Sequence, residues 1–542
     1  MIARIDWRRF EETSLIFAHY LYQFEKVEGF FSHNYQDKNS FYKLAEELRR
    51  DKGRDAFLLL AEENREVGSS KEVVEKLEKA GKVGGVAVIT GQQVGLFGGP
   101  AYTLFKALTA AKLAHFLEEE LKIPVIPIFF LASEDHDIAE VNRFIFLNRD
   151  YRLIELSLPR IEEGRRPVSS IRLGKEVEKL LATFKAELPA PGIPPSLEGA
   201  LYSSYTEEAT FSSSFARLLA KLLSPYGIAI LEPNSKKLKE IAIPLFEQEI
   251  LKAKEREELF SSHLKGLSER GYHIQVPGNR GRLNLFLLSE AGERARIYLA
   301  EDGFIIGREG EKVSSSHLIS LLKEEPERFS PDVLLRPLFQ DFILPTIAYV
   351  AGPAEIAYFA ELRPLYTFFN IPMPVIYPRA SFTVVDDITL RLAHQLSLAI
   401  PELVSSPNET LDRFKRSLVD TEAEEEISQL EEETLATKER IKEKLTELDP
   451  NIGKKVDSAL GKIIYQLERL KLKIGKANLR RKEELRRRLE RLKNILAPDK
   501  KPQERMLGWV YLLADYGEKV MDKVYQEIEL PPRDHKVIRV ER

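Results

Sequence analysis

The sequence predicts an α/β protein whose core is an open, doubly wound parallel sheet, followed by a long antiparallel coiled coil. Continuous apolar runs bounded by glycine or proline predict strands that are buried on both faces. Helical patterns beside most of these runs predict crossover connections between parallel strands. The stretch from Leu390 to Leu496 is rich in Glu, Lys, Arg and Leu and poor in glycine and proline, which indicates long charged helices.

At 542 residues the chain is too long for a single hydrophobic core. We expect a helical layer at 1–80, the sheet core at 81–385, the coiled coil at 386–500, and a final helix and tail at 501–542. The predicted strands of the core are Val83 to Thr90, Pro124 to Ala132, Ile228 to Glu232, Leu344 to Val350, and Pro374 to Tyr377.

Two insertions interrupt the predicted sheet. Residues 143–200 combine short apolar pieces with many prolines, as is typical of a surface insertion. Residues 270–310 hold short strand patterns separated by turn signals such as Asp302-Gly303, which predict an antiparallel meander. Its expected strands are His273 to Val276, Leu283 to Leu288, Arg296 to Leu299, and Phe304 to Ile306.

A heptad pattern predicts the coiled coil. Its seam consists of Val456, Leu460, Ile463, Leu467, Leu470 and Ile474, and resumes at Leu485, Leu489, Leu492 and Leu496. Asp449 to Gly453 is the predicted turn between an acidic helix, with Glu422 and Glu431, and a basic helix from Arg480 to Arg491. We favour a solvated charged face and a homodimer seam, with an RNA-binding arm as the alternative.

Composition narrows the class of function. The net charge of −4 gives no argument for binding nucleic acid or anionic membranes. No apolar run reaches about 18 residues and the first ten residues lack an apolar signal core, so we expect no membrane span and a cytoplasmic protein. Without cysteine there is no thiolate metal site or cysteine nucleophile, and with nine histidines in no HExxH pattern we expect no metal site.

A glycine-rich turn after the first strand is the first candidate for ligand binding. Gly91, Gly95, Gly98 and Gly99 lead into a helix at about Ala101, and the amides at a helix N-terminus attract phosphate or carboxylate. The candidate binding residues are Gln92, Gln93, Gly95, Gly99, Pro100, Tyr102, Thr103 and Lys106. The spacing matches neither GxGxxG nor the P-loop, so a strained but empty connection is the alternative.

The second candidate follows the second strand, where Glu134-Asp135-His136-Asp137 places three carboxylates and an imidazole. Such a group can bind an ammonium, act as general base toward an amine, or hold a divalent ion. The alternative is a solvated loop in which Asp137 caps a helix. Because the carboxyl ends of parallel strands meet at one edge, we expect this cluster near the glycine turn.

The third candidate comprises Arg336, Gln340 and Asp341, followed after a strand by Gly352 and Glu355. Gly352-Pro353 repeats the layout of Gly99-Pro100, with proline at the start of a helix. Arg336 suits a bidentate contact with carboxylate or phosphate, although a structural ion pair is the alternative. Arg379 lies similarly beyond the last strand.

Two further segments suggest a nucleotide. Lys312 to Ser316 resembles the KMSKS loop of class I aminoacyl-tRNA synthetases, which contacts ATP phosphates; capping of the next helix by Ser315 or Ser316 is the favoured explanation. Trp509, close to Arg505, suits stacking on a base, but packing of the last helix onto the coiled coil is the simpler explanation.

Taken together, these segments resemble the BshC family, the cysteine-adding enzymes of bacillithiol biosynthesis. The resemblance covers essentially the whole chain and rests on Gly91 to Thr103 with Lys106, Glu134 to Asp137, Arg336 to Asp341, Gly352 to Glu355 with Tyr358, and Gln503 to Arg505. The chain departs from the pattern at Gly98, where threonine is expected, and at Ala101, where leucine is expected.

The resemblance implies a nucleotidyltransferase-like Rossmann core and a coiled coil used for homodimerisation. It also implies the reaction, in which the carboxyl of cysteine joins the amine of glucosaminyl-malate. A carboxylate and an amine condense poorly in water, so we expect activation by ATP or another nucleotide and no tightly bound cofactor.

On this hypothesis His136, oriented by Asp135 or Asp137, accepts the proton of the attacking amine, and Lys106 or Arg336 offsets developing charge. The rival hypotheses are a nucleotidyltransferase or synthetase-like ligase with another acceptor, and a non-catalytic dimeric binding protein.

Overall fold

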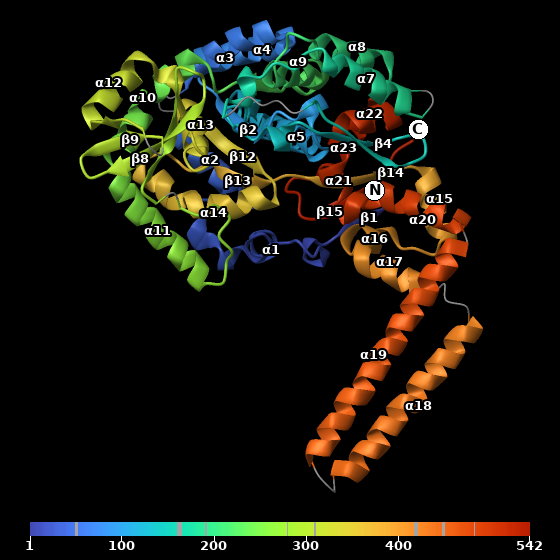
Figure 1. Cartoon of the computed structure of the whole chain (residues 1–542). Helices are drawn as coiled ribbons and strands as arrows, with labels where there is room; N and C mark the ends of the chain where they lie inside the picture. The colour runs from blue at the N-terminus through green and yellow to red at the C-terminus, as the bar shows by residue number, and fades with distance from the viewer. Residues whose placement is uncertain are drawn as a thin grey trace. The chain divides into compact units, whose positions relative to one another are not determined.

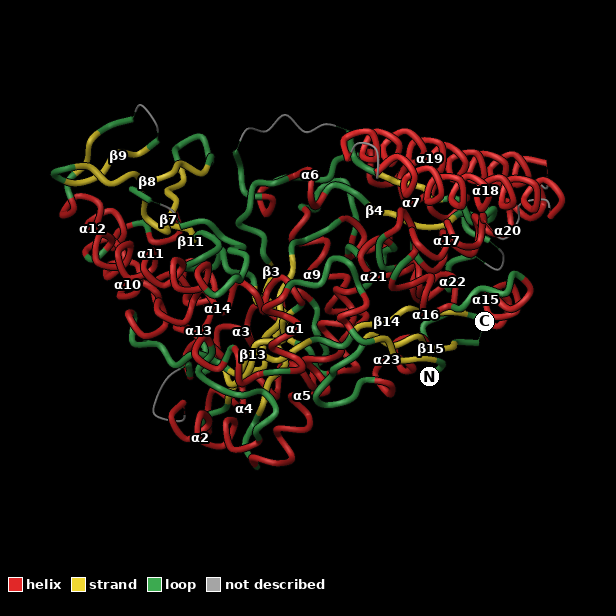
Figure 2. The backbone as a smooth tube through the Cα atoms, turned by 90° about the horizontal axis from the view of Figure 1, so that it is seen from below, coloured by secondary structure: helices red, strands yellow, loops and turns green. Residues whose placement is uncertain are grey.

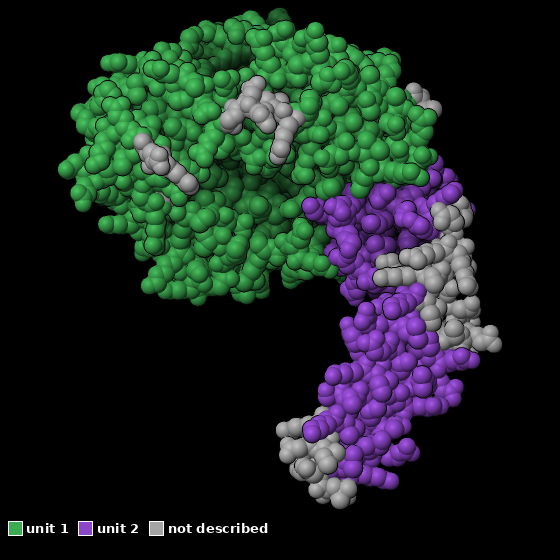
Figure 3. Space-filling view, in the orientation of Figure 1, with its two compact units in different colours: residues 1–384, 503–542 green, residues 385–502 purple. Residues whose placement is uncertain are grey.

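The computed structural model describes residues 1–48, 53–159, 165–189, 192–278, 280–307, 310–416, 421–446, 450–481 and 483–541. These residues form two compact units, which Figure 3 distinguishes by colour. Unit 1 consists of Met1–Val384 together with Gln503–Arg542, and unit 2 consists of Val385–Pro502. None of the described helices combines the length and the apolarity that a membrane crossing requires.

The core of unit 1 is a five-stranded sheet with the order β13-β12-β2-β3-β6, in which every pairing is parallel. Its strands are β2 (Val86–Gln92), β3 (Val125–Leu131), β6 (Ala229–Leu231), β12 (Thr346–Ala351) and β13 (Val375–Pro378). Nearly all their residues are buried, which explains the continuous apolar runs. The five predicted strands and the α/β class are confirmed, with the first strand beginning at Val86 because a helix extends to Val83.

Helices cover this sheet (Figure 1). The N-terminal helices are α1 (Leu15–Tyr22), α2 (Lys38–Leu48), α3 (Arg54–Val67) and α4 (Lys71–Val83). Helix α4 packs against β3 and β6, and α2 packs against β12. The crossover helix α5 (Tyr102–Leu121) packs against β2, β3 and β12, and α14 (Pro353–Phe368) follows β12.

The first insertion forms a hairpin and two helices. Its elements are β4 (Phe144–Leu147), β5 (Leu153–Leu156), α7 (Glu176–Glu187) and α8 (Pro195–Ser204), after which α9 (Phe211–Leu223) returns the chain to β6. Strands β4 and β5 pair only with each other, so this insertion lies outside the parallel sheet.

The second insertion begins with α10 (Lys236–Leu251) and α11 (Ala253–Glu269) and builds a separate antiparallel sheet, the meander, with the order β10-β9-β8-β7-β11. Figure 2 shows β7, β8 and β9 as a group apart from β3 and β13. The strands are β7 (Arg282–Leu288), β8 (Arg294–Ala300), β9 (Gly303–Ile306), β10 (Lys312–Val313) and β11 (Phe329–Pro331).

Two predictions for this insertion are wrong. His273 to Val276 is not a strand, because the Gln275 and Val276 amides donate hydrogen bonds to the Glu361 carboxylate instead of to a neighbouring strand. The cap of α12 (Ser315–Glu324) is Ser314, whose hydroxyl accepts a hydrogen bond from the His317 amide at 3.1 Å. The helix therefore begins earlier than the predicted cap residues allow.

Strands near the two ends of the given sequence meet in a small three-stranded sheet of unit 1. Strand β15 (His535–Arg539) pairs with β1 (Ala3–Ile5) and with β14 (Ser381–Val385). The helices between unit 2 and β15 are α21 (Gln503–Met506), α22 (Trp509–Tyr516) and α23 (Lys519–Glu527). One further helix of the core, α13 (Arg336–Ile343), precedes β12.

Unit 2 is entirely helical. Its helices are α15 (Asp387–Gln395), α16 (Ile400–Ser405), α17 (Pro407–Arg416), α18 (Thr421–Thr446), α19 (Pro450–Arg481) and α20 (Glu483–Leu496). Helices α18 and α19 lie antiparallel, and ion pairs join Glu431 to Lys471 and Lys438 to Asp457. This pairing of opposite charges along the two helices confirms the coiled coil.

Two details of the coiled coil differ from the sequence pattern. Asp449 lies outside the described residues, but Pro450 to Gly453 begin α19, since proline suits the first turn of a helix. Leu467 is buried, whereas Ile463 and Leu470 are 46% and 43% exposed. The predicted seam is therefore only partly covered by α18; the side chains of Glu422, Ile474, Arg480 and Lys482 lie outside the described residues.

Candidate active site

The candidate site lies at the carboxyl edge of the five-stranded sheet. The chain runs from β2 through β3 to β6 on one side, and later from β12 to β13 on the other side of β2. The strand order therefore reverses between β2 and β12, and open α/β sheets bind ligands outside the carboxyl ends of the strands at such a point. The glycine turn follows β2 and Gly352 follows β12, so both lie at this reversal point.

One side of the glycine turn is covered by Trp509. The indole is fully buried, and its Nε1 donates a hydrogen bond to the Gly98 carbonyl oxygen at 2.8 Å. Gly98 has a φ of 86°, and a Cβ there would overlap the indole. The indole therefore requires glycine where the family pattern has threonine. No face of Trp509 is free for a base, which corrects the stacking hypothesis.

The open side of the turn faces a small pocket of about 80 Å³. Predicted residues that line it are Gln92, Gln93, Gly95, Gly99, Pro100, Tyr102 and Arg505. Within hydrogen-bond distance, Gln92 Nε2 donates to the Tyr102 hydroxyl at 3.1 Å, and Gln93 Nε2 donates to Glu140 at 2.6 Å. Thr103 Oγ1 is buried without a hydrogen-bond partner in the described part of the chain. This space fits a carboxylate or a phosphate.

Lys106 is buried beneath the turn. Its Nζ lies 2.7 Å from Glu355 Oε2 and donates a hydrogen bond to the Gly91 carbonyl oxygen. Glu355 also accepts hydrogen bonds from the Gly352 amide at 2.7 Å and from the Tyr349 hydroxyl at 2.8 Å. Burial lowers the pKa of Lys106 and the Glu355 carboxylate opposes this shift. Glu355 is therefore held by the protein's own donors.

Arg336 adds a second cation to the same group. It is half-buried at the start of α13. Burial lowers its pKa, but Tyr358, Tyr349 and Glu355 outweigh burial and the net shift is upward. The two cations Lys106 and Arg336 lie near one carboxylate, that of Glu355. The resulting excess of positive charge favours an anionic ligand group at the reversal point.

The acidic cluster after β3 is partly used by the protein itself. Glu134 Oε1 lies 2.6 Å from Nζ of Lys239 on α10, and these side chains are 10% and 0% exposed. Burial lowers the pKa of Lys239, and Glu134 opposes the shift. Lys239 thus occupies the place expected for a substrate ammonium, so the prediction that Glu134 binds substrate is corrected.

Another carboxyl, that of the half-buried Glu232, lies beside this pair just after β6. It accepts hydrogen bonds from the hydroxyls of Ser133 and Ser212. Burial raises the pKa of Glu232 to about 7. The nearby charge of Glu134 also raises this pKa, whereas the hydrogen bonds from Ser133 and Ser212 lower it. Glu232 is therefore a carboxyl that titrates near neutral pH.

The other acidic residues of the cluster have separate roles. Asp137 is the N-cap of α6 (Ile138–Val141) and accepts a hydrogen bond from the Glu140 amide at 3.3 Å, as the alternative reading of the sequence proposed. Asp135 Oδ1 accepts a hydrogen bond from the His136 amide at 2.7 Å and lies 3.5 Å from His136 Nδ1. Asp135 is therefore near the imidazole, although His136 Nδ1 is buried without a hydrogen-bond partner in the described part of the chain.

His136 is the group at this edge best suited to take a proton. Its side chain is 34% exposed, so solvent and small molecules reach it. Burial lowers the pKa of His136; Asp135 opposes this, and Arg294 and Arg165 lower the pKa further. The imidazole is therefore neutral at pH 7 and able to accept a proton from an amine.

Three predicted binding residues are structural. Gln340 Nε2 and the Tyr366 hydroxyl donate hydrogen bonds to Asp341 at 2.8 and 2.6 Å in the interior, and burial raises the pKa of Asp341 to about 6. Arg379 forms a buried bidentate pair with Glu504, with N–O distances of 2.9 and 2.6 Å. Because these polar groups pair with one another, they are not available to a substrate.

Lys312 lies apart from the reversal point. It is exposed on β10, at the edge of the meander, where its backbone pairs with Ile305. No group of three or more His, Asp or Glu side chains in the described ranges is arranged to hold a metal ion.

Sequence reasoning missed the groups that neutralise or surround the predicted residues. Lys239 belongs to a charged helix whose pattern does not mark it as buried. Glu504 is likewise paired with a distant residue, Arg379, 125 positions away. One signal was present in the sequence: Arg294, Arg296 and Tyr298 alternate along β8, and alternation places side chains on one face of a strand.

Comparison with known proteins adds the family. Residues 4–380 match the model of Bacillithiol biosynthesis BshC, N-terminal Rossmann-like domain, and residues 382–540 match that of its C-terminal coiled-coil domain. The chain is 31% identical over 532 residues to a protein of Koribacter versatilis named "Putative cysteine ligase BshC", covering 97% of this chain and 98% of that protein. Proteins of the same name from Salinibacter ruber (29% identical; 97% and 96% covered) and Solibacter usitatus (31%; 97% and 98%) are similar over the same extent.

Proposed function

Because the chain belongs to the BshC family, we propose that it is a ligase that joins the carboxyl of cysteine to the amine of glucosaminyl-malate, which yields bacillithiol. Relatives named as cysteine ligases over nearly their whole length support the reaction. The observation that carries the proposal is His136, a half-exposed imidazole with a lowered pKa at the carboxyl end of β3.

His136 acts as the general base in this proposal. Asp135 Oδ1 lies 3.5 Å from Nδ1, and Nε2 is the atom that accepts the proton of the amine. The nitrogen of glucosaminyl-malate then forms a bond to the acyl carbon of cysteine, and the group on that carbon leaves with its electron pair.

The acyl group lies at the reversal point. The excess positive charge of Lys106 and Arg336 over Glu355, together with the small pocket at the glycine turn, suits an anionic leaving group such as a phosphate. We therefore propose ATP or another nucleotide as a co-substrate that activates cysteine, rather than a tightly bound cofactor.

The test is incubation of the protein with cysteine, glucosaminyl-malate and ATP, followed by mass analysis of the thiol product and of AMP against ADP. Bacillithiol together with either nucleotide product supports the proposal. Nucleotide turnover with a different amine only would favour another acceptor, and binding without turnover would favour a non-catalytic protein.

The His136→Asn variant gives the sharpest single-residue test. We expect its coupling rate to fall by roughly 10²–10⁴-fold, because asparagine cannot accept the proton, while the Kd for glucosaminyl-malate changes by less than about twofold. Since the pKa of His136 is lowered, the wild-type rate should stay level as the pH falls toward 6.5 and drop only below it. His317→Asn, at an exposed histidine of α12, is the control. Retained turnover in His136→Asn would exclude His136 as the base.

We further propose that two copies of the chain pair through unit 2, and that the enzyme is cytoplasmic. Ile463 and Leu470 of α19, one heptad apart, and Leu430 and Leu435 of α18 are exposed apolar residues. Ile463→Glu with Leu470→Glu should convert a dimer to a monomer in sedimentation, whereas Leu251→Glu, at an exposed leucine of unit 1, should not. A wild-type protein that sediments as a monomer at micromolar concentration would refute the pairing.

A further inference from the structure

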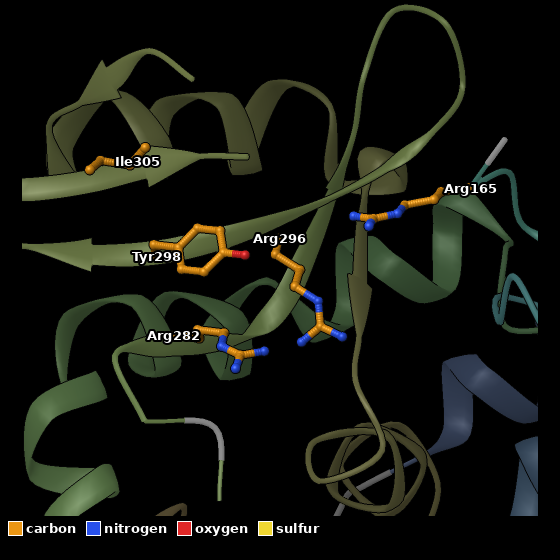
Figure 4. Close-up of a pocket in the computed structure, with 5 residues that line it drawn as sticks. All are labelled: Arg165, Arg282, Arg296, Tyr298 and Ile305. Carbon is orange, nitrogen blue, oxygen red and sulfur yellow. The ribbon is translucent and has the colours of Figure 1, made fainter. Parts of the chain in front are cut away.

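A second pocket lies on one face of the meander and has a volume of about 460 Å³. Arg282, Arg296, Tyr298 and Ile305 of the meander line it, together with Arg165 of the first insertion. In Figure 4 the guanidinium groups of Arg282 and Arg296 lie next to each other, and Arg165 extends toward them from a separate segment. Three arginines from two insertions therefore surround one space large enough for a small-molecule ligand.

The register of the strands explains why these side chains share a face. Arg282 pairs with Tyr298, Tyr298 with Ile305, and Ile305 with Lys312, which places one residue from each of four adjacent strands in a single row. Arg296 lies two residues before Tyr298 and so points to the same face.

The three arginines carry unbalanced charge. No carboxylate among the described residues lies within 4 Å of the guanidinium groups of Arg165, Arg282 or Arg296. Aromatic rings hold two of them instead: the Arg282 guanidinium is 5.9 Å from the Tyr298 ring centroid, and that of Arg296 is 5.5 Å from Phe286. Arginines that stay charged and unpaired around one pocket suit a ligand with at least two negative charges.

The pocket adjoins the proposed base. Arg294, two residues before Arg296 on β8, lies with Nη1 3.8 Å from Asp135 Oδ1, the oxygen that faces the His136 imidazole. Arg165 and Arg296 are also close enough to His136 to lower its pKa. The arginine pocket and the proposed base are therefore neighbours.

We propose that this pocket binds the two carboxylates of the malate part of glucosaminyl-malate. The inference rests on the proposed function: the amine and the malate are attached to neighbouring carbons of the sugar, so an amine held at His136 directs the malate into the adjoining space. Cysteine, with one carboxylate and an ammonium, does not match three unpaired cations. The phosphates of a nucleotide share the chemistry of a multiply charged anion and form the competing source.

Calorimetric titration of the full chain distinguishes the two sources. The variants are Arg296→Gln and Arg282→Gln, and the control is Arg217→Gln at an exposed arginine of α9. Each is titrated with glucosaminyl-malate, with glucosaminyl-lactate, which keeps one carboxylate, and with ATP. Melting temperatures check folding, and Arg296→Lys keeps the charge without the bidentate geometry.

We expect each pocket variant to bind glucosaminyl-malate about 10- to 100-fold more weakly than the wild type, through loss of a charged hydrogen bond. The wild type should bind glucosaminyl-lactate more weakly than glucosaminyl-malate, and the loss caused by the variants should be smaller for the lactate compound. Arg296→Lys should lie between Arg296→Gln and the wild type. Binding of ATP should be unchanged, as should every affinity of Arg217→Gln.

Three results would overturn the inference. If the pocket variants bind glucosaminyl-malate as tightly as the wild type, while the wild type still makes bacillithiol, the malate lies elsewhere and the proposed function stands. If the loss appears in the titration with ATP instead, the pocket binds nucleotide phosphates. A wild type that neither binds nor converts glucosaminyl-malate would remove the proposed function as well.

Discussion

The carboxyl edge of the parallel sheet and the face of the meander are both rich in charge, yet they treat it in opposite ways. At the sheet edge each buried cation has a carboxylate partner: Lys239 with Glu134, Lys106 with Glu355, and Arg379 with Glu504. On the meander, Arg165, Arg282 and Arg296 line an open pocket with no such partner among the described residues. At the sheet edge these pairs shape the site and leave Arg336 as the excess cation, whereas all three arginines of the second pocket are available to a ligand.

The difference follows from burial. A buried charge without a partner costs several kcal/mol, so the side chains beneath the sheet edge must pair with one another. Arginines at a half-exposed pocket keep much of their hydration and tolerate the lack of a carboxylate. Unusual residues at the end of a strand therefore do not identify binding groups until their partners are known.

The strongest test of this comparison is Lys239→Met. Its loss removes the ion-pair partner of the buried Glu134 and leaves Arg294 as the nearby cation, so we expect the free energy of unfolding to fall by about 3–5 kcal/mol in urea denaturation. The matched control is Lys237→Met on the same helix, since Lys237 and its partner Glu62 are 62% and 60% exposed and their pair is worth about 0–1 kcal/mol. Equal losses in the two variants would mean that the buried pair is not distinctive.

Glu232→Gln gives a smaller, pH-dependent effect that sharpens the comparison, because Glu232 is a half-buried carboxyl held by hydroxyls rather than by a cation. Its pKa rises from 4.5 to about 7 in the folded protein, so the wild type loses stability as the pH increases from about 4.5 to 7. Glutamine does not ionise. The stability of the variant relative to wild type should increase by about 1–3 kcal/mol between pH 5 and pH 8. A difference that does not vary with pH would mean that Glu232 titrates normally.

The sequence was most informative where the chain repeats a simple pattern. The strands of the parallel sheet are buried on both faces, so β3 and β12 appear in the sequence as unbroken apolar runs. Charge and heptad spacing likewise predicted the two helices of the coiled coil, which Glu431 and Lys471 join by an ion pair. The segment at His273 misled because its apolar alternation is real but its amides bond to the distant Glu361.

The candidate site was only partly predictable. The order of motifs brought the glycine turn and His136 to one edge of the sheet, because both follow parallel strands. Arg336 joins them from the start of α13, before β12, a placement that strand ends do not determine. Which charges are already paired was not predictable, because Glu134 and Lys239 are 105 residues apart and no local pattern joins them. The arginine pocket was missed for a similar reason: Arg165 reaches it from a different insertion.

The hydrogen bond between Trp509 and Gly98 also bears on how the protein is made. The two residues are 411 positions apart, and the glycine turn leaves the ribosome long before its indole partner is synthesised. The turn gains the packing of the indole only when the segment after the coiled coil has been synthesised. Nascent chains released before that point would lack the residue that covers one side of the glycine turn, so the candidate site is completed late in synthesis.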